Sequence, residues 1–260
     1  MISQVLRRLV RGGVIGGVLL SCILFFVRCS HTESVKENPD GLFAEAEESF
    51  QDERYLIAIE KYRDIKNRFP YSSRALDAEL RIADCYYEQE SYLEAASSYE
   101  IFLELHPTHP KTDYVQYRIA MSYYNQIPEN AARDLSAAYK AIDEFQILLD
   151  KHSSSSYAEK AKDYIQEARK RLAEQENYVA DFYFQRKHYL SASYRYAALL
   201  QDYPNLGYEE EALYRLGMSY YHIRMFSNAR DTLNRLLKQF PESGNAGQAR
   251  GIVEDLTKRN

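Results

Sequence analysis

The stretch that decides the fold lies between Ala83 and Pro107 and reads ADCYYEQESYLEAASSYEIFLELHP. Ala83 is followed three positions later by Tyr86. Nine positions further stands Ala95, and four beyond it Tyr99. Small residues at these two places allow two antiparallel helices to approach closely, and aromatic rings fill the space beside them. Proline ends the second helix because it cannot continue one. The pattern predicts a helical hairpin of the tetratricopeptide type.

The same order of residues occurs five times along the chain. The second, fourth and fifth copies match well, the first is weaker, and the third is stretched by about nine residues around Ile127-Pro128-Glu129-Asn130. No such hairpin buries its apolar face alone, so neighbouring repeats supply the core. The sequence therefore predicts an all-α superhelix of about five helix-turn-helix repeats. The five sets of pattern positions are Ala46, Ser49, Ala58, Tyr62, Pro70; Ala83, Tyr86, Ala95, Tyr99, Pro107; Ala120, Tyr123, Ala141, Phe145, Ser153; Ala180, Tyr183, Ala192, Tyr196, Pro204; and Gly217, Tyr220, Ala229, Leu233, Pro241.

Two more helices are predicted beyond the hairpins. Between Ser155 and Gln185 there is no proline or glycine, and apolar residues recur at three- and four-residue steps. We expect one long helix there, joining the third repeat to the fourth. Residues 245–260 predict a terminal helix that caps the last repeat. The chain therefore divides into N-terminal repeats one to three over residues 42–156, and a C-terminal part over residues 157–260 with the long helix, repeats four and five and the cap.

Residues 1–28 predict export. They carry four arginines and no acid, and sixteen uncharged residues lie between Arg11 and Arg28. A basic start followed by an apolar run shorter than the roughly 20 residues of a membrane span is typical of a secretory signal. An uncleaved N-terminal anchor is the alternative. Residues 29–41 are polar and contain Pro39 and Gly41, which predicts a flexible tether.

Two cysteines are candidates for lipid attachment. Cys22 follows Leu19-Leu20-Ser21, which is similar to the small-residue pattern at which bacterial lipoproteins are cleaved. Cys29 follows Arg28 instead, but it opens the polar tether. Both remain candidates, and a covalent lipid anchor carrying palmitate is the one attached group that we expect. Cys85 has no partner cysteine in the body with which to form a disulfide. It lies beside the small-residue packing position of its repeat, which predicts a buried, inert thiol.

The sequence predicts no enzyme. It has no glycine-rich phosphate loop, no paired-cysteine metal spacing and no nucleophile elbow. With 33 basic against 38 acidic residues it also lacks the basic footprint of a nucleic-acid-binding protein. His106 and His109 come closest to a metal-binding pair, but Pro107 and Pro110 place them in a turn rather than on one helical face. We expect no catalytic residue, no metal and no cofactor.

One segment adds a family resemblance. Residues 105–117, LHPTHPKTDYVQY, resemble the BamD family, also called ComL, of lipoproteins in the machinery that assembles outer-membrane β-barrels. Residues 178–183, YVADFY, resemble it too, as does Arg195 followed by Asp202-Tyr203-Pro204. The resemblance covers nearly the whole mature chain. Arg28 before Cys29 departs from the family pattern.

The resemblance implies a non-catalytic scaffold that a lipid anchor tethers to the periplasmic face of the outer membrane. Its C-terminal repeats would bind the barrel-forming assembly subunit, with Arg195 reaching an acidic residue of that partner. Its N-terminal repeats would receive unfolded outer-membrane proteins, with Tyr62, Tyr86 and Tyr99 as candidate contacts. Accessory lipoproteins are further expected partners, and nucleic acid is not.

Alternatives to these assignments remain. Arg195 also fits an ordinary exposed helix-face arginine, and core packing explains Tyr62, Tyr86 and Tyr99 equally well. For the whole chain the alternative is another exported tetratricopeptide adaptor of the cell envelope, acting in cell-wall or division coordination.

Overall fold

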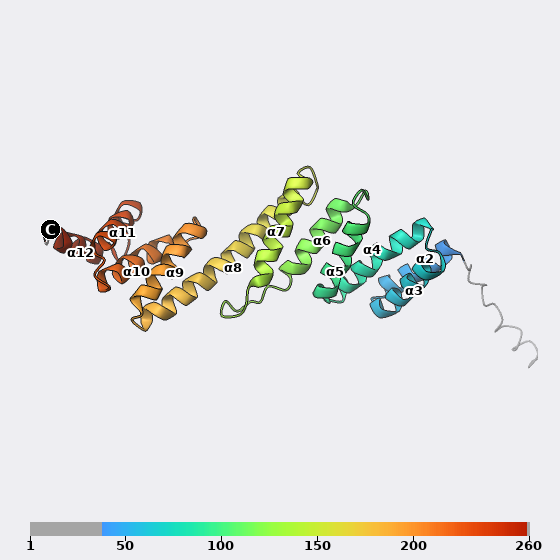
Figure 1. The fold of residues 1–260 in the computed structure, drawn as a ribbon, viewed down its shortest axis with the longest axis horizontal. Helices are drawn as coiled ribbons and strands as arrows, with labels where there is room; N and C mark the ends of the chain where they lie inside the picture. The colour runs from blue at the N-terminus through green and yellow to red at the C-terminus, as the bar shows by residue number, and fades with distance from the viewer. Residues whose placement is uncertain (1–37, 259–260) are drawn as a thin grey trace, which may run out of the picture. The chain divides into compact units, whose positions relative to one another are not determined.

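The computed structural model describes residues 38–258, and this part of the chain is built from eleven α-helices and no strand (Figure 1). The predicted all-α class is confirmed. Among these residues, no helix combines the length and apolar character needed to cross a membrane. The predicted signal, Cys22, Cys29 and most of the predicted tether lie outside the described residues.

The chain forms two compact units, one ending at Glu79 and the other starting at Leu80. The described helices of the first unit are α2 (Pro39–Gln51), α3 (Tyr55–Arg68) and the start of α4 (Ser73–Glu88). The second unit continues α4 and adds α5 (Tyr92–Leu105), α6 (Thr112–Tyr124), α7 (Ser136–Lys151), α8 (Ala158–Gln185), α9 (Tyr189–Asp202), α10 (Glu209–His222), α11 (Phe226–Gln239) and α12 (Ala246–Lys258).

The helices pair in the five predicted hairpins, each of which joins an even-numbered helix to the next odd-numbered one. The small residues of the pattern are fully buried in every hairpin. In the fifth, a Cβ on Gly217 would lie 2.5 Å from Leu233 Cδ2, so this position accepts no larger residue without movement of that leucine. The alanines with 0% exposure are Ala46, Ala58, Ala83, Ala95, Ala120, Ala141, Ala180, Ala192 and Ala229.

Four of the hairpins share one turn geometry. In the second hairpin the N–H of Ser91 donates to the carbonyl of Tyr86 at 2.9 Å, and the N–H of Glu90 donates to the carbonyl of Tyr87 at 3.0 Å. This is a Schellman motif, which requires a left-handed residue directly after the helix. That residue is never glycine here: it is Glu53 (φ 59°), Glu90 (φ 63°), Lys187 (φ 61°) or Arg224 (φ 63°).

An aromatic pair closes each of these four turns. The last aromatic of the first helix packs against an aromatic five positions later, with ring centroids 5.4 to 6.1 Å apart. In these four hairpins the last aromatic residue of the first helix therefore packs inside its own hairpin. The pairs are Phe50–Tyr55, Tyr87–Tyr92, Phe184–Tyr189 and Tyr221–Phe226.

The third hairpin differs because residues 125–135 form a longer connection between α6 and α7. Tyr124 packs against Tyr164 of α8 at 4.7 Å instead of closing the turn. Ile127 contacts two core clusters, one built on α6, α7 and the start of α8, the other on Leu135, the first turn of α7 and helices α8 to α12. Gln175 of α8 donates to the carbonyl of Arg133 at 2.7 Å. The connection between α6 and α7 therefore contacts the middle of α8 and holds it in place.

The predicted long helix is confirmed as α8, whose 28 residues extend about 42 Å. Its first half packs against α7, where Phe145 and Tyr164 stack with centroids 5.5 Å apart, and its second half packs against α9. The predicted border between residues 156 and 157 does not coincide with the division between the compact units, because these contacts join α7 and α8 in one core.

The predicted tether over residues 29–41 is wrong at its end, because helix α2 begins at Pro39. The side chain of Asn38 accepts the N–H of Gly41 at 2.8 Å and so caps the helix. Proline is favoured at the first helical position because it has no N–H that needs a partner there. The sequence Asn-Pro-Asp-Gly is thus a helix start rather than a linker.

The left-handed turn position gives a stability test. We expect Lys187→Gly to stabilise the protein by up to about 1 kcal/mol, because glycine adopts this backbone conformation without steric cost. The matched control is Lys170→Gly in the exposed middle of α8, where the same substitution should cost about 1 kcal/mol. Urea unfolding followed by circular dichroism measures both. Destabilisation of similar size at both positions would contradict the strain at Lys187.

Candidate functional site

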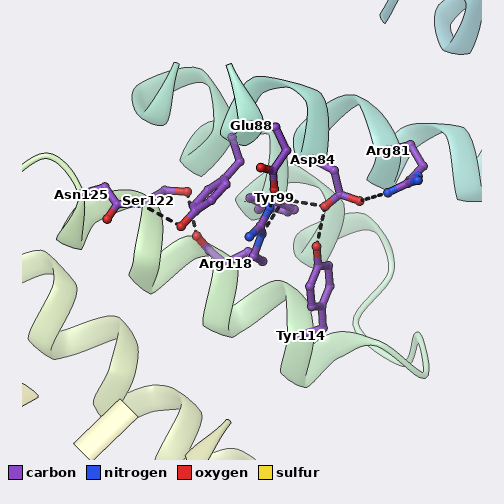
Figure 2. Close-up of polar contacts among 9 residues, drawn as sticks. Arg81, Asp84, Glu88, Tyr99, Tyr114, Arg118, Ser122 and Asn125 are labelled. Carbon is purple, nitrogen blue, oxygen red and sulfur yellow. Dashed lines mark hydrogen bonds and ion pairs between the residues drawn. The ribbon is translucent and has the colours of Figure 1, made fainter. Parts of the chain in front are cut away.

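A polar cluster that joins three helices is built on Asp84 of α4 (Figure 2). Its carboxylate accepts the hydroxyl of Tyr99 at 2.6 Å, the hydroxyl of Tyr114 at 2.7 Å and Nη1 of Arg81 at 3.2 Å. The side chain of Asp84 is only 6% exposed. Three hydrogen bonds from α4, α5 and α6 therefore replace the water that this buried charge would otherwise need.

Arg118 of α6 completes the cluster from the other side. Its Nε donates to the hydroxyl of Tyr99 at 3.1 Å, and its Nη2 donates to Glu88 at 2.6 Å. The guanidinium lies 3.5 Å from the centroid of the Tyr87 ring, a cation–π contact. Tyr87 in turn accepts a hydrogen bond from Asn125 at 2.9 Å. The arginine thus ties the third hairpin to both helices of the second.

The cluster recurs 97 residues further along the chain. There Asp181 of α8 accepts the hydroxyl of Tyr196 at 2.5 Å and Nη1 of Arg215 at 2.5 Å. In the first unit, Tyr62 donates to Glu47 at the corresponding positions. A carboxylate next to the small residue of the first helix, bonded to a tyrosine of the second, is therefore part of the repeat.

Burial and negative charge keep these tyrosines neutral. Burial, and then the charge of Asp84, raises the pKa of Tyr99 well above its usual range, and the same two causes raise the pKa of Tyr114. Burial and the hydrogen bond to Asp181 raise the pKa of Tyr196. Each hydroxyl therefore stays a donor to its carboxylate.

The arrangement holds helices together. The buried polar side-chain atoms of the described residues all have a hydrogen-bond partner. In this part of the chain no three His, Cys, Asp or Glu side chains are grouped as ligands for a metal ion. The rings of His106 and His109 both pack on Phe102, with centroids 4.9 and 5.1 Å away. Cys85 is 0% exposed, which confirms the prediction of a buried thiol.

The structure does not place Tyr62 and Tyr99 on a binding surface. Both are 0% exposed, and their hydroxyls are bound to Glu47 and Asp84 inside the protein. The prediction that they contact a partner is therefore corrected: they are core residues, because the repeat pattern places its second-helix aromatic inside the hairpin. Tyr86 is half-buried.

Arg195 lies on the exposed face of α9, with 46% of its side chain accessible. Its Nη1 donates to both carboxylate oxygens of Glu176 on α8, at 3.0 and 3.1 Å. Glu176 is only 18% exposed. Arg195 therefore has an internal partner. Of the two side chains in this ion pair, Arg195 is the more exposed to solvent.

The α8–α9 hairpin that carries Arg195 also exposes large apolar side chains. On α8 these are Tyr178, 51% exposed, and Phe182, 41% exposed, whose ring lies 3.7 Å from the Arg186 guanidinium. On α9 they are Leu190, 53% exposed, and Tyr194, 70% exposed. Aromatic residues beside arginine are typical of the centres of protein interfaces.

The comparison with known protein families decides the assignment. The family model YfiO, described as an outer membrane lipoprotein, matches residues 36–236. This chain belongs to that family. The match covers the described repeats up to α11, so the resemblance noted from residues 105–117 and 178–183 is confirmed for the body of the chain.

Several curated relatives of this YfiO-family chain have the name outer membrane protein assembly factor BamD. The protein of Neisseria meningitidis serogroup A is 30% identical over 213 residues, which cover 78% of this chain and 80% of the relative. That of Vibrio cholerae is 28% identical over 223 residues, covering 79% and 92%. Among solved structures, the TPR2AB domain of yeast Sti1 in complex with pHSP90 is 16% identical, with a TM-score of 0.41, over 84% of this chain and 98% of that chain.

Sequence reasoning missed the central polar residues, Asp84, Tyr114 and Arg118. A signal for them exists in this YfiO-family sequence. The acid stands directly after the small residue of its repeat, and an arginine stands two residues before the small residue of the next. Adding 97 to Asp84 and Arg118 gives Asp181 and Arg215, so internal comparison of the repeats would have marked both pairs.

Removal of the central carboxylate tests this cluster. We expect Asp84→Ala to destabilise the protein by about 3 kcal/mol, because it removes the internal carboxylate that accepts the hydroxyls of Tyr99 and Tyr114. Asp77→Ala on the same helix removes an exposed contact to Arg74 and should cost less than about 0.5 kcal/mol. Urea unfolding compares the two variants. Equal, small losses would refute the structural role of Asp84.

Proposed function

We propose that this protein is a non-catalytic scaffold for the assembly of β-barrel proteins in the outer membrane. The single observation that carries the proposal is the match of most of the chain to proteins named outer membrane protein assembly factor BamD. The fold supports it, because repeats of helical hairpins act by holding other polypeptides. The polar cluster supports a scaffold as well, since its buried polar side chains form hydrogen bonds between helices.

We further propose that a lipid anchor holds the protein at the periplasmic face of the outer membrane. The basic, acid-free start of the chain and the two cysteines at positions 22 and 29 support export and lipid attachment. The acidic balance of the remaining chain does not favour binding to anionic lipid by charge, so the anchor carries the attachment. The mass of the mature N-terminus distinguishes Cys22 from Cys29, and an unmodified Met1 would contradict both.

The partners follow from the same proposal. The C-terminal part, residues 157–260, would bind the barrel-forming subunit, and the N-terminal repeats over residues 42–156 would receive unfolded outer-membrane proteins. Accessory lipoproteins would join the same complex. Of the three candidate tyrosines, Tyr86 alone keeps a partly accessible ring for a substrate contact, since Tyr62 and Tyr99 are internal.

Arg195 is the proposed contact to the barrel-forming subunit. Its exposed position, the neighbouring Tyr194 and the planar fork of the guanidinium suit a carboxylate partner. The bond to Glu176 uses Nη1 of the guanidinium. A carboxylate of the partner would therefore either bind the other guanidinium nitrogens or displace Glu176. Glu176 would then orient the arginine before binding.

Depletion of the protein tests the function. We expect β-barrel proteins to disappear from the outer membrane, and the barrel-forming subunit to co-purify with this chain from gently solubilised envelopes. A cell-envelope adaptor for wall synthesis or division would instead leave barrel proteins at their normal level and alter cell shape. Reproducible absence of the barrel-forming subunit from the purified material would defeat the proposal.

The contact itself is tested by charge reversal. We expect Arg195→Glu to weaken binding to the purified barrel-forming subunit at least tenfold, or about 1.4 kcal/mol, with helicity unchanged. Lys170→Glu, an equal charge change on the exposed face of α8, is the control and should change binding less than twofold. Glu176→Gln removes the internal competitor while leaving Arg195 in place. Unchanged binding of Arg195→Glu would remove the arginine from the interface.

A further inference from the structure

Helix α5 exposes three large aliphatic side chains that its packing does not use. Leu93 is 65% exposed, Ile101 50% and Leu105 61%. The opposite face of the same helix is buried and contains the residues that form the core, among them Tyr99 and Phe102 at 0% exposure. Single exposed leucines are ordinary on a protein surface, but a short helix that exposes three large aliphatic side chains has more exposed apolar area than is usual.

Acidic side chains lie among these aliphatic residues. Glu94 and Glu104 are exposed, and no lysine or arginine within residues 38–258 forms an ion pair with either. Glu100 accepts a hydrogen bond from Tyr123 at 2.7 Å. The fourteen residues of α5 include no base at all. The exposed face therefore combines apolar area with uncompensated negative charge.

The geometry of this face suits an elongated ligand. At 3.6 residues per turn, the exposed residues of α5 fall within an arc of about 140°, and Leu93 and Leu105 lie about 18 Å apart along the axis. That length equals three turns of a second helix laid along the first. We define this α5 face as Leu93, Glu94, Ile101, Glu104 and Leu105.

We propose that the α5 face is a docking surface for a cationic amphipathic segment of another polypeptide. The aliphatic side chains would cover the apolar stripe of that segment, and Glu94 and Glu104 would face its lysines or arginines. An anionic membrane surface presents the wrong charge to these carboxylates, so a lipid ligand fits the face less well. The site is separate from Arg195, which lies on α9, and it does not depend on the proposed assembly function.

Binding of a synthetic peptide tests the proposal. The probe is a fluorescein-labelled, eighteen-residue peptide of leucine and lysine, with leucine at helical spacing; a peptide of equal composition in scrambled order is its control. We expect the mature, non-lipidated full chain to bind the ordered peptide at least tenfold more tightly than the scrambled one in fluorescence anisotropy. Equal binding of the two peptides would mean that charge alone attracts them, and it would overturn the proposal.

Two variants locate the site. The triple variant Leu93→Gln, Ile101→Gln, Leu105→Gln should weaken binding at least tenfold, and Glu94→Gln with Glu104→Gln should weaken it and reduce its salt dependence. Matched controls are Leu56→Gln, 71% exposed at the corresponding position of α3, and Glu159→Gln, an acid 85% exposed on α8; both should bind within twofold of the parent.

The outcome can be read even if one variant folds poorly. Circular dichroism reports the fold, and Ile101→Gln alone replaces the triple variant if helicity falls. Equal losses in the controls and in the α5 variants would overturn the assignment to this face. So would binding of vesicles containing anionic lipid that the α5 variants abolish, because that result would identify a membrane ligand.

Discussion

The close approach of two antiparallel helices is the constraint on which the rest of this structure depends. Alanine or glycine at the crossing point leaves no side chain between the backbones, so each hairpin can bury an aromatic or leucine next to it, from Tyr62 to Leu233. The left-handed turn that follows the first helix is a consequence of the same constraint, because the chain must reverse at once to keep the two small residues opposite each other. Four non-glycine residues accept backbone strain for this purpose.

Buried carboxylates fix how neighbouring hairpins of this apolar framework are oriented relative to each other. Leucine and alanine contacts permit several relative rotations of neighbouring hairpins, whereas the bonds of Asp84 to Tyr99 and Tyr114 have fixed lengths and directions. The equivalent contacts of Asp181 show that the same solution serves the C-terminal repeats. A buried polar cluster gains little net energy over an apolar one, so its contribution lies in specifying one arrangement of three helices.

The hairpins were predictable because their pattern is local and repeated: Ala83 and Ala95 predict the same crossing wherever the spacing recurs. The predicted tether is wrong at Pro39 because the role of a proline depends on the residue before it, and Asn38 caps the helix that Pro39 begins. The Asp84 cluster could not be derived from one repeat, since its side chains come from three helices whose stacking sets their distances. For Tyr62 and Tyr99 the sequence left binding and core packing open, and their 0% exposure agrees with core packing, which the repeat pattern itself requires.

Helix α8 belongs to two hydrophobic clusters at once, and residues 125–135 are fastened to its middle. In most repeat proteins each helix belongs to one repeat and contacts only the neighbouring repeats. A terminal repeat can therefore unfold while the others stay folded. Here α8 forms the fourth hairpin with α9 while its first half packs against α7 of the third, so fraying of either hairpin would expose the apolar side of the other. The second unit should therefore lose these two hairpins in a single cooperative step, so that hydrogen exchange across α8 reports one opening event rather than two.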